Sequence, residues 1–329
     1  MYEILDRENS FYKKGKERHF LAYRSKEPLA RLAAMVNPDL PQSPPMGLFG
    51  FFECRDDLEG VEEIFKAALA WLCEQGCTQC RGPIDRNAWL CYRVMTQGFR
   101  EQPIYLEPYN KTWYPKHLEE IGFKACAEYI SAINVQPERV VEEFAGGVTF
   151  AERNGVSFRT FDMDKFDAEM KLLYDIFHAS VDDEYGYGTL EFSSFKARYE
   201  KIKELLDPRV IIIALAPNGK GAGYILGMPE CSRPIASMGG KRGVFSKIQY
   251  WLNKRQRSPI LNYSSPKIVP AARGKGMTNG LKAKLYQAAI EASYTRTHYR
   301  TVRKDKLIQR PEEDAKVIYK EYSLYAKDI

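Results

Sequence analysis

The chain has 329 residues, a length that suits two domains better than one small domain. Its hydrophobic (44%) and charged (28%) fractions are those of globular proteins, and a formal net charge of +6 is too small by itself to indicate a nucleic-acid binder. No apolar run is long enough to span a bilayer, and the first ten residues have no signal-peptide core. We therefore expect a soluble cytoplasmic protein that has no membrane contact.

The cysteines also bear on the compartment and on metal binding. Seven cysteines without a small-domain disulfide framework are typical of a reducing compartment. Cys73, Cys77 and Cys80 are spaced closely enough to suggest part of a zinc site, but Cys54 and Cys91 do not complete a second pair. We expect free thiols and no metal.

The first half of the chain alternates strands and helices. Gly47–Cys54 is a very apolar strand, and Asp56 and Asp57 follow it where helix caps are favoured. Apolar residues then recur at helical spacing over Leu58–Glu74, and Gly76 ends that helix. The other elements expected here are a strand hairpin, a short helix and a further strand, at Arg18–Tyr23, Leu29–Val36, Pro115–Ile121 and Gly122–Tyr129.

The second half has the same kind of alternation at greater length. A β-branched run predicts a buried strand at Arg209–Ala216, and Gly223–Met228 pairs back with it as a hairpin. Leu261–Val269 is the next expected strand, and the helix Met277–Ser293 follows it. The remaining elements expected are the strands Val156–Phe161, His298–Val302 and Glu321–Ala326 and the helices Lys165–Ser180, Phe195–Leu206 and Pro311–Tyr319.

This order predicts an α/β (α+β) protein made of two mixed-sheet units in tandem. The N-terminal domain is expected at residues 1–135, a linker at 136–155 and the C-terminal domain at 156–329. Within the linker we expect a short helix at Pro137–Phe144 and a hinge or turn at Gly146–Gly147.

The stretch Ile268–Leu281 (IVPAARGKGMTNGL) carries the most chemical information. A strand leads into a loop of glycines and basic residues, and a helix follows. Glycines let the backbone approach a ligand closely, and the helix N-terminus adds the positive end of its dipole. Such a loop can hold a pyrophosphate, although a solvated basic turn is the alternative. Neither a Walker loop nor a dinucleotide fingerprint is present.

The V-P-x-x-R-G-K-G loop and its strand–loop–helix order resemble the acyl-CoA-binding motif R/Q-x-x-G-x-G/A of the Gcn5-related N-acetyltransferase (GNAT) superfamily. Arg273 matches the first position and Gly276 the fourth, whereas Thr278 stands where glycine or alanine is usual. Segments of the first half resemble the N-terminal part of the tandem GNAT-like proteins common in bacteria. These segments are Asn9–Ala22, Gly47–Glu53, Arg81–Pro83, Gly98–Phe99 and Pro108–Phe123.

The resemblance implies a GNAT-type N-acyltransferase with one working donor site, in the second half. The first half has Cys54–Leu58 (CRDDL) in place of the loop, and two aspartates would repel phosphates. The expected donor is acyl-CoA (acetyl-CoA or longer) or an acyl-carrier protein, and the acceptor is an amine on a small molecule or peptide. The residues expected to bind the donor are Ile268, Val269, Arg273, Gly274, Lys275, Gly276, Met277 and Thr278.

In this superfamily an amine attacks the thioester directly, and backbone N–H groups, here those around Ile268 and Val269, polarise the carbonyl. A tyrosine on the last helix often protonates the thiolate; Tyr319 is the match, and a core ring is the alternative. Glu184 is the candidate base unless its loop is simply an exposed acidic one. His298 is the candidate proton relay unless it is structural.

Other functions stay open at this point. The basic tract Lys241–Arg257 suits an acidic carrier protein, a peptide or RNA, but also a solvated surface helix, and we expect no nucleic-acid partner. A non-catalytic module that senses acyl-CoA is one alternative function. A fatty-acyl or aminoacyl transferase that modifies a peptide is another.

Overall fold

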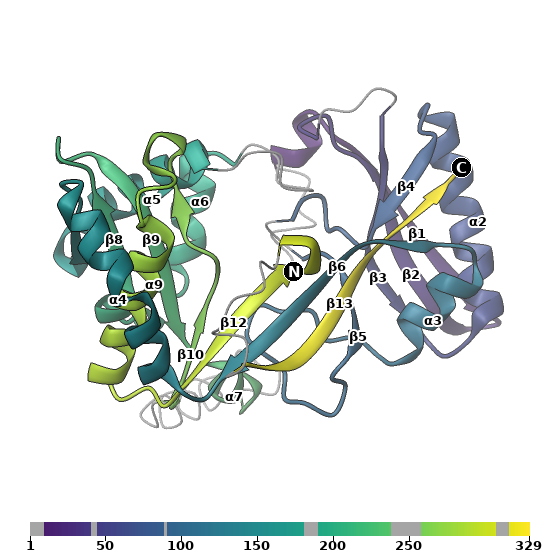
Figure 1. Ribbon diagram of the computed structural model, residues 1–329. Helices are drawn as coiled ribbons and strands as arrows, with labels where there is room; N and C mark the ends of the chain where they lie inside the picture. The colour runs from purple at the N-terminus through teal and green to yellow at the C-terminus, as the bar shows by residue number, and fades with distance from the viewer. Residues whose placement is uncertain (1–9, 41–44, 89–90, 181–189, 238–257, 307–315) are drawn as a thin grey trace. The chain divides into compact units, whose positions relative to one another are not determined.

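The computed structural model describes residues 10–40, 45–88, 91–180, 190–237, 258–306 and 316–329 (Figure 1). The chain forms two compact units. The first contains Met1–Tyr129, Asp183–Thr189 and Lys320–Ile329, and the second contains Ile130–Asp182 and Leu190–Tyr319. Strands β6 (Lys124–Asn134) and β13 (Lys316–Asp328) contribute residues to both units.

A mixed sheet and two α-helices form the first unit. Its strands follow the order β1–β2–β3–β4–β13, with β5 beside β13. The pairs β1/β2 and β2/β3 are antiparallel, whereas β3/β4 is parallel. The elements are η1 (Ser10–Lys13), β1 (Lys16–Arg24), β2 (Glu27–Val36), β3 (Gly47–Cys54), α2 (Leu58–Glu74), β4 (Gln79–Gly82), β5 (Val94–Gln97) and α3 (Trp113–Glu120).

Helix α2 forms where the sequence predicts it, and it covers the core of this unit. The Asp57 side chain accepts a hydrogen bond from the Gly60 amide at 2.8 Å, which is the capping that starts the helix. Its apolar face packs on the sheet, where Phe65 meets Phe49 edge-on at 5.0 Å and Phe123 at 5.2 Å between ring centroids.

The second unit has the strand order β7–β8–β9–β10–β12, with the short strand β11 paired to β9. Its core lies between the sheet and the helices α4 and α9, and contains Ile212, Ile225, Leu261, Leu281 and Leu285. The α-helices and strands are α4 (Pro137–Arg153), β7 (Ser157–Thr160), α5 (Phe166–Ser180), α6 (Phe192–Glu200), β8 (Ile211–Leu215), β9 (Gly221–Pro229), α7 (Ser232–Ser237), β10 (Ile260–Tyr263), β11 (Lys267–Ile268), α9 (Met277–Glu291) and β12 (Arg296–Arg303). The 3₁₀ turns are η2 (Met163–Lys165), η3 (Lys203–Leu205), η4 (Pro208–Val210), η5 (Pro270–Ala272) and η6 (Lys304–Lys306).

The two units repeat one topology. In the first, the antiparallel strands β1, β2 and β3 are followed by α2 and then by β4, parallel to β3. In the second, the antiparallel strands β8, β9 and β10 are followed by α9 and then by β12, parallel to β10. The mixed α/β fold of two related units is therefore the one that the sequence predicts.

The hinge expected at Gly146–Gly147 is wrong, because both glycines lie inside one continuous helix, α4. Gly147 is explained by packing. A Cβ built on it would lie 2.5 Å from Cβ of Asn279 and 2.9 Å from the Gly280 amide nitrogen, both on α9. Gly146 has no such neighbour: no atom lies within 4 Å of the Cβ position. Gly147 thus permits a close helix crossing, where the sequence suggested a turn.

Three other expected elements differ in the structure. Residues 316–319 belong to strand β13, so a helix ending at Tyr319 is wrong there, and residues 307–315 lie outside the described part of the chain. Leu261–Val269 divides into β10 and β11 around Pro266. The helix expected at Phe195–Leu206 begins earlier and ends at Glu200, and the 3₁₀ turn η3 follows it.

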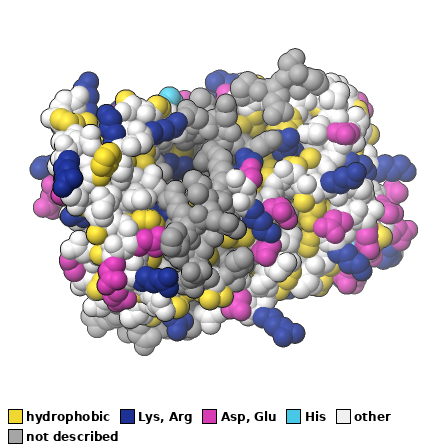
Figure 2. Space-filling view, in the orientation of Figure 1, with side chains coloured by type: hydrophobic (Ala, Val, Ile, Leu, Met, Phe, Trp, Pro, Cys, Tyr) yellow, Lys and Arg dark blue, Asp and Glu magenta, His cyan; other side chains and the backbone are white. Residues whose placement is uncertain are grey.

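Charged side chains of both signs are interspersed on the face shown in Figure 2, with separate apolar side chains between them. The excess of Lys and Arg is not gathered into one basic patch among the described residues of that face. Among the described helices, none combines the length and the apolar character that crossing a bilayer would need.

The crossing of α4 and α9 gives a matched pair of variants. Gly147→Ala should lower the free energy of unfolding by about 1–3 kcal/mol, because the new methyl group overlaps α9. Gly146→Ala should be neutral or raise it by up to about 1 kcal/mol, because the added methyl group meets open space and alanine favours helix. Urea denaturation of both variants measures the difference, and equal effects would contradict the close crossing.

Candidate functional site

Two neighbouring strands of the second unit, β10 and β12, are paired over only part of their length. Strand β10 pairs with β12 from Ile260 opposite Arg296 to Tyr263 opposite Tyr299. Beyond that last pair, β12 runs on to Arg303, while the chain after β10 continues as β11, which pairs with β9. A parallel pair that stops in this way leaves the facing backbone edges of the two strands without each other's hydrogen bonds.

The direction of the β11 amides follows from this pairing. The Val269 amide donates to the Ala222 carbonyl of β9 at 3.0 Å. Since successive N–H groups of an extended chain point to opposite edges, the Ile268 amide points away from β9, toward the side where β12 has parted. Of the two amides expected to polarise a carbonyl, only Ile268 therefore has a suitable direction.

The basic glycine loop directly follows β11. Pro270–Ala272 form a 3₁₀ turn in which Ala272 is buried, and Gly274 and Gly276 have φ of 76° and 69°. These left-handed conformations explain why glycine occupies both positions. Arg273 precedes Gly274, Lys275 lies between the two glycines, and both side chains are exposed, so two cationic side chains lie beside a backbone that a ligand can approach.

Helix α9 begins without a side-chain cap. Its N-cap residue is Gly276, which has no side chain, and the Gly280 amide makes the first helical bond, to the Gly276 carbonyl at 2.8 Å. Amides earlier in the first turn, such as those of Met277 and Thr278, have no intrahelical acceptor. Such free amides, the helix dipole and nearby cations are the features that favour an anion at a helix start.

Arg273 is tied to a neighbouring element of the same unit. One of its guanidinium nitrogens donates to the Ser180 carbonyl at the end of α5 at 3.2 Å. This bond holds one side of the loop next to α5. The donor-binding residues expected from the sequence lie one after another along β11, the loop and the first turn of α9, and Met277 among them is buried.

Two of the three expected catalytic residues come together in the structure. The His298 and Tyr319 rings stack with centroids 5.4 Å apart and an angle of 29° between their planes. His298 is buried on β12, one residue before the pair at which β10 and β12 part, and Tyr319 is half-buried on β13. The third, Glu184, lies outside the described residues, as does the basic tract Lys241–Arg257.

A polar pair that the sequence reading missed lies beside His298. Asn262 is the register partner of His298, so the two side chains leave the same face of the sheet. Asn262 is buried and donates to a Glu230 carboxylate oxygen at 2.5 Å. A polar residue inside the apolar strand β10 is the one signal in the sequence that could have marked this position.

The opposite face of the same strands is held by tyrosines. Tyr263 and Tyr299 stack at 5.0 Å, and the Tyr263 and Tyr286 hydroxyl oxygens lie 2.8 Å apart. The Thr297 hydroxyl donates to Tyr286 at 2.9 Å. These contacts connect β10, β12 and α9 at the point where the strands begin to part, and so they fix the geometry of the opening.

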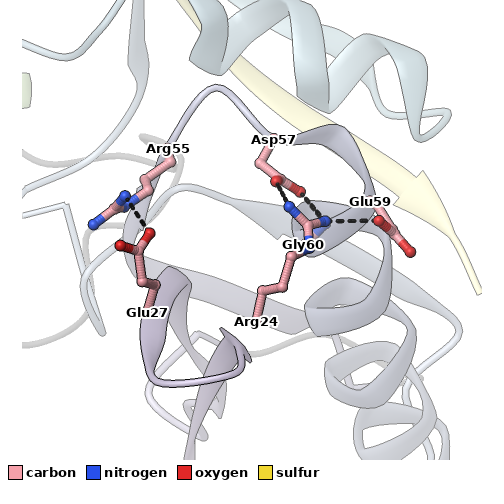
Figure 3. Close-up of polar contacts among 6 residues, drawn as sticks. All are labelled: Arg24, Glu27, Arg55, Asp57, Glu59 and Gly60. Carbon is pink, nitrogen blue, oxygen red and sulfur yellow. Dashed lines mark hydrogen bonds and ion pairs between the residues drawn. The ribbon is translucent and has the colours of Figure 1, made fainter.

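The first unit has a corresponding helix start, but its own side chains occupy it (Figure 3). The Asp57 carboxylate caps α2, and Arg24 donates to Asp57 at 2.5 Å and to Glu59 at 2.7 Å. Hydrogen bonds from Arg24 and from the Gly60 amide lower the pKa of Asp57. This helix N-terminus thus already holds an anion, and further carboxylates surround it.

In the first unit, the place where the parallel strands β3 and β4 stop pairing is also filled by the chain itself. Strand β3 pairs with β4 only at Gly47 and Leu48. Farther along β3, the Ile84 amide donates to the Phe49 carbonyl at 2.8 Å, and the Phe51 amide donates to the Asp85 carboxylate at 2.6 Å. A Cβ on Gly50 would lie 2.3 Å from the Ile84 carbonyl oxygen, so this segment sits directly against the strand.

A buried ion pair holds that filling segment in place. Arg86 donates to the two carboxylate oxygens of Glu17 at 2.6 and 3.0 Å, and both side chains are almost fully buried. Burial alone would raise the pKa of Glu17, but hydrogen bonds from His19 and Arg86 outweigh it and lower the pKa to about 2. Breaking a buried pair of this kind is strongly destabilising, so the first unit is built closed.

Metal chemistry has no evident ligands in the part of the chain that the structure describes. There, no group of three or more His, Cys, Asp or Glu side chains is placed to hold a metal ion. The cysteines of that part are free thiols, and burial raises the pKa of Cys54 to about 12.

Comparison with known proteins found no matching family model. Protein YghO of Escherichia coli (strain K12) is 25% identical over 194 residues, which are 59% of this chain and 50% of that protein. The bacterial ceramide synthase of Caulobacter vibrioides is 24% identical over 298 residues, which are 88% of this chain and 77% of that protein. The chain thus spans half the length of the first relative and about three quarters of the second.

Among solved structures, the chain is similar to the GCN5-related glucosamine N-acetyltransferase region of a fungal multi-domain GH3 β-N-acetylglucosaminidase. The TM-score is 0.55 at 13% identity, and the match covers 96% of this chain and 34% of that one. This likeness shows that the chain has the GNAT fold, as its sequence predicts.

The closed opening of the first unit gives a pH-dependent prediction. Burial raises the pKa of Asp85 to about 6 from its ordinary 3.8, although the Phe51 amide and Arg31 lower it. Because the pKa of Asp85 is higher in the folded chain than in the unfolded one, ionisation of Asp85 lowers the free energy of unfolding. This loss develops as the pH rises from about 4 to 6. Asp85→Asn, whose amide oxygen still accepts from Phe51, should raise the free energy of unfolding at pH 7.5 by about 1–3 kcal/mol and change it little at pH 4.

Urea denaturation at the two pH values measures the change. Asp57→Asn is the matched control. Because the pKa of Asp57 is lowered in the folded chain, its ionisation adds stability above the ordinary pKa. Its replacement should therefore weaken the protein more at pH 7.5 than at pH 4. A uniform loss of stability in Asp85→Asn at both pH values would contradict this account.

Proposed function

We propose that the chain is an N-acyltransferase that moves an acyl group from acyl-CoA to an amine, with its donor site in the second unit. The observation that carries the proposal is the difference between two equivalent helix starts. Helix α9 begins at a bare glycine flanked by Arg273 and Lys275, whereas α2 begins at Asp57, which Arg24 already neutralises. Of these two helix starts, α9 is the one that offers unused amides to an anionic ligand.

The donor would lie along β11, the loop and the first turn of α9. Its pyrophosphate would accept hydrogen bonds from the amides of the loop and of Met277 and Thr278, with Arg273 and Lys275 adding charge. Its thioester arm would enter where β10 and β12 part, and would pair with backbone that these strands leave exposed to each other.

Chemistry in this arrangement needs a polarised carbonyl and two proton movements. The Ile268 amide points to the open side of β11 and is the donor proposed for the thioester oxygen. As the amine nitrogen bonds to the carbonyl carbon, the carbon–sulfur bond breaks. His298, with Asn262 beside it, is proposed to take the amine proton, and Tyr319 to give one to the departing thiolate.

The ceramide synthase, whose match covers 88% of this chain, suggests a chemical class for the acceptor. A ceramide is an amide between a fatty acid and a long-chain amino alcohol, so the ceramide synthase of Caulobacter vibrioides forms an N-acyl bond. We propose the same class of acceptor here, a long-chain amino alcohol, with a fatty acyl donor. A water-soluble amine is the competing acceptor, and the assay separates the two.

The test is thiol release from acetyl-, octanoyl- and palmitoyl-CoA in the presence of sphinganine, glucosamine or a peptide with a free N-terminus. Sphinganine with a fatty acyl-CoA should give the highest kcat/KM. His298→Gln and Tyr319→Phe should lower kcat by about 10²-fold or more, because each removes a proton-transfer group, and should leave KM for acyl-CoA nearly unchanged.

Charge reversal in the loop tests the donor site separately. Arg273→Glu should raise KM for acyl-CoA by about tenfold or more, because it places a carboxylate beside the phosphates. Arg55→Glu reverses an exposed charge in the corresponding loop of the first unit and is the matched control, expected to leave KM unchanged. Equal effects of the two variants, or no turnover together with no binding of any CoA species, would overturn the proposal.

A further inference from the structure

We propose that Phe150 is a stacking platform for the adenine ring of CoA, and hence that the donor carries a nucleotide and is not a carrier protein. This inference rests on the function proposed above. It deepens that proposal by choosing between two donors that share the phosphopantetheine arm and differ in the adenosine part.

Phe150 is unusual for a large apolar ring of this unit, because it is 51% exposed. It lies in the last turns of α4, whose end is secured by a hydrogen bond from the Asn154 side chain to the Phe150 carbonyl at 2.8 Å. The other phenylalanines of the unit that pack in cores are almost fully buried: Phe144, Phe161, Phe166, Phe177 and Phe195. The ring is therefore held on a fixed helix while much of its surface faces outward.

The position of this ring relative to the anion loop follows from the crossing of α4 and α9. Gly147 of α4 contacts Asn279 and Gly280, and one turn later Phe150 contacts Gly276. A Cβ on Gly276 would lie 3.0 Å from the Phe150 Cδ1 atom. Helices α4 and α9 therefore run antiparallel (Figure 1). The Phe150 ring lies against Gly276, the residue at which the loop ends and α9 begins.

There is room beside the ring. Gly146 lies one turn before Phe150 on the same side of α4, and no atom is within 4 Å of a Cβ built on it. Packing thus accounts for Gly147 but leaves Gly146 unexplained, although glycine is a poor residue inside a helix. A helix surface without a side chain next to an exposed ring leaves space for a second flat ring.

The charges around this ring suit a nucleotide. Arg153 follows Phe150 by three residues, is exposed, and makes no ion pair among the described residues. Lys275 of the loop is exposed on the neighbouring element. A flat π system next to Gly276, with one cation on its own helix and another on the neighbouring loop, fits an adenine whose ribose carries a phosphate. The phosphopantetheine of a carrier protein has the phosphate but no ring.

The test is calorimetric titration of CoA and of 4′-phosphopantetheine into the wild-type chain and its variants. Wild type should bind CoA at least tenfold more tightly than 4′-phosphopantetheine. Phe150→Ala and Phe150→Leu should each weaken CoA binding by about tenfold, because a stacked base is lost. Neither variant should change the binding of 4′-phosphopantetheine. This ligand is the control, because a structural disturbance of the loop would weaken its binding as well. Phe150→Trp should keep the affinity for CoA.

Three results would overturn the inference. They are unchanged CoA binding in Phe150→Ala, equal wild-type affinity for the two ligands, and full retention of CoA binding in Phe150→Leu, which would indicate an apolar contact without stacking. The failure of the broader proposal looks different: wild type would then bind neither ligand, or Arg273→Glu would bind both as tightly as wild type does.

Discussion

The first turn of an α-helix leaves amide groups that need acceptors, and how each unit meets that need decides which of them can bind a ligand. At α2 the need is met internally, because Asp57 caps the helix and Arg24 neutralises the carboxylate. At α9 the cap residue is Gly276, which can offer no side-chain acceptor. The two units share a topology, but the amides at the start of α2 have a side-chain acceptor, whereas Gly276 provides none at the start of α9.

The same division holds where the strands part. In the first unit Ile84 and Asp85 bond to the backbone of β3, and the buried pair of Arg86 with Glu17 holds them there. In the second unit β11 pairs with β9, and the Ile268 amide points to the other side. His298, Asn262 and Tyr319 lie around that opening. The first unit thus fills the place between its strands with its own chain, whereas the proposed site lies in the second unit.

Much of the fold could be read from local patterns. Leu58–Glu74 is the helix that its apolar spacing and its aspartate cap predict, and the glycine loop before Met277 is where the sequence places it. The pair Gly146–Gly147 could not be read, because a close helix crossing and a turn require the same residue and only the partner helix distinguishes them. The alternating directions of the Ile268 and Val269 amides depend on pairing with β9, and the contact of His298 with Tyr319 joins two strands far apart in sequence. Such features arise from tertiary contacts, which no local pattern encodes.

The most direct measurement of the central claim, that only the second unit has an open donor site, is hydrogen–deuterium exchange of the whole chain with and without saturating CoA. The account predicts slower exchange of amides in peptides that cover residues 268–281, where the loop and the first turn of α9 gain an acceptor. It predicts unchanged exchange over residues 50–60, where Asp57 and Asp85 already accept. Protection at the start of α2 with none at the start of α9 would contradict it.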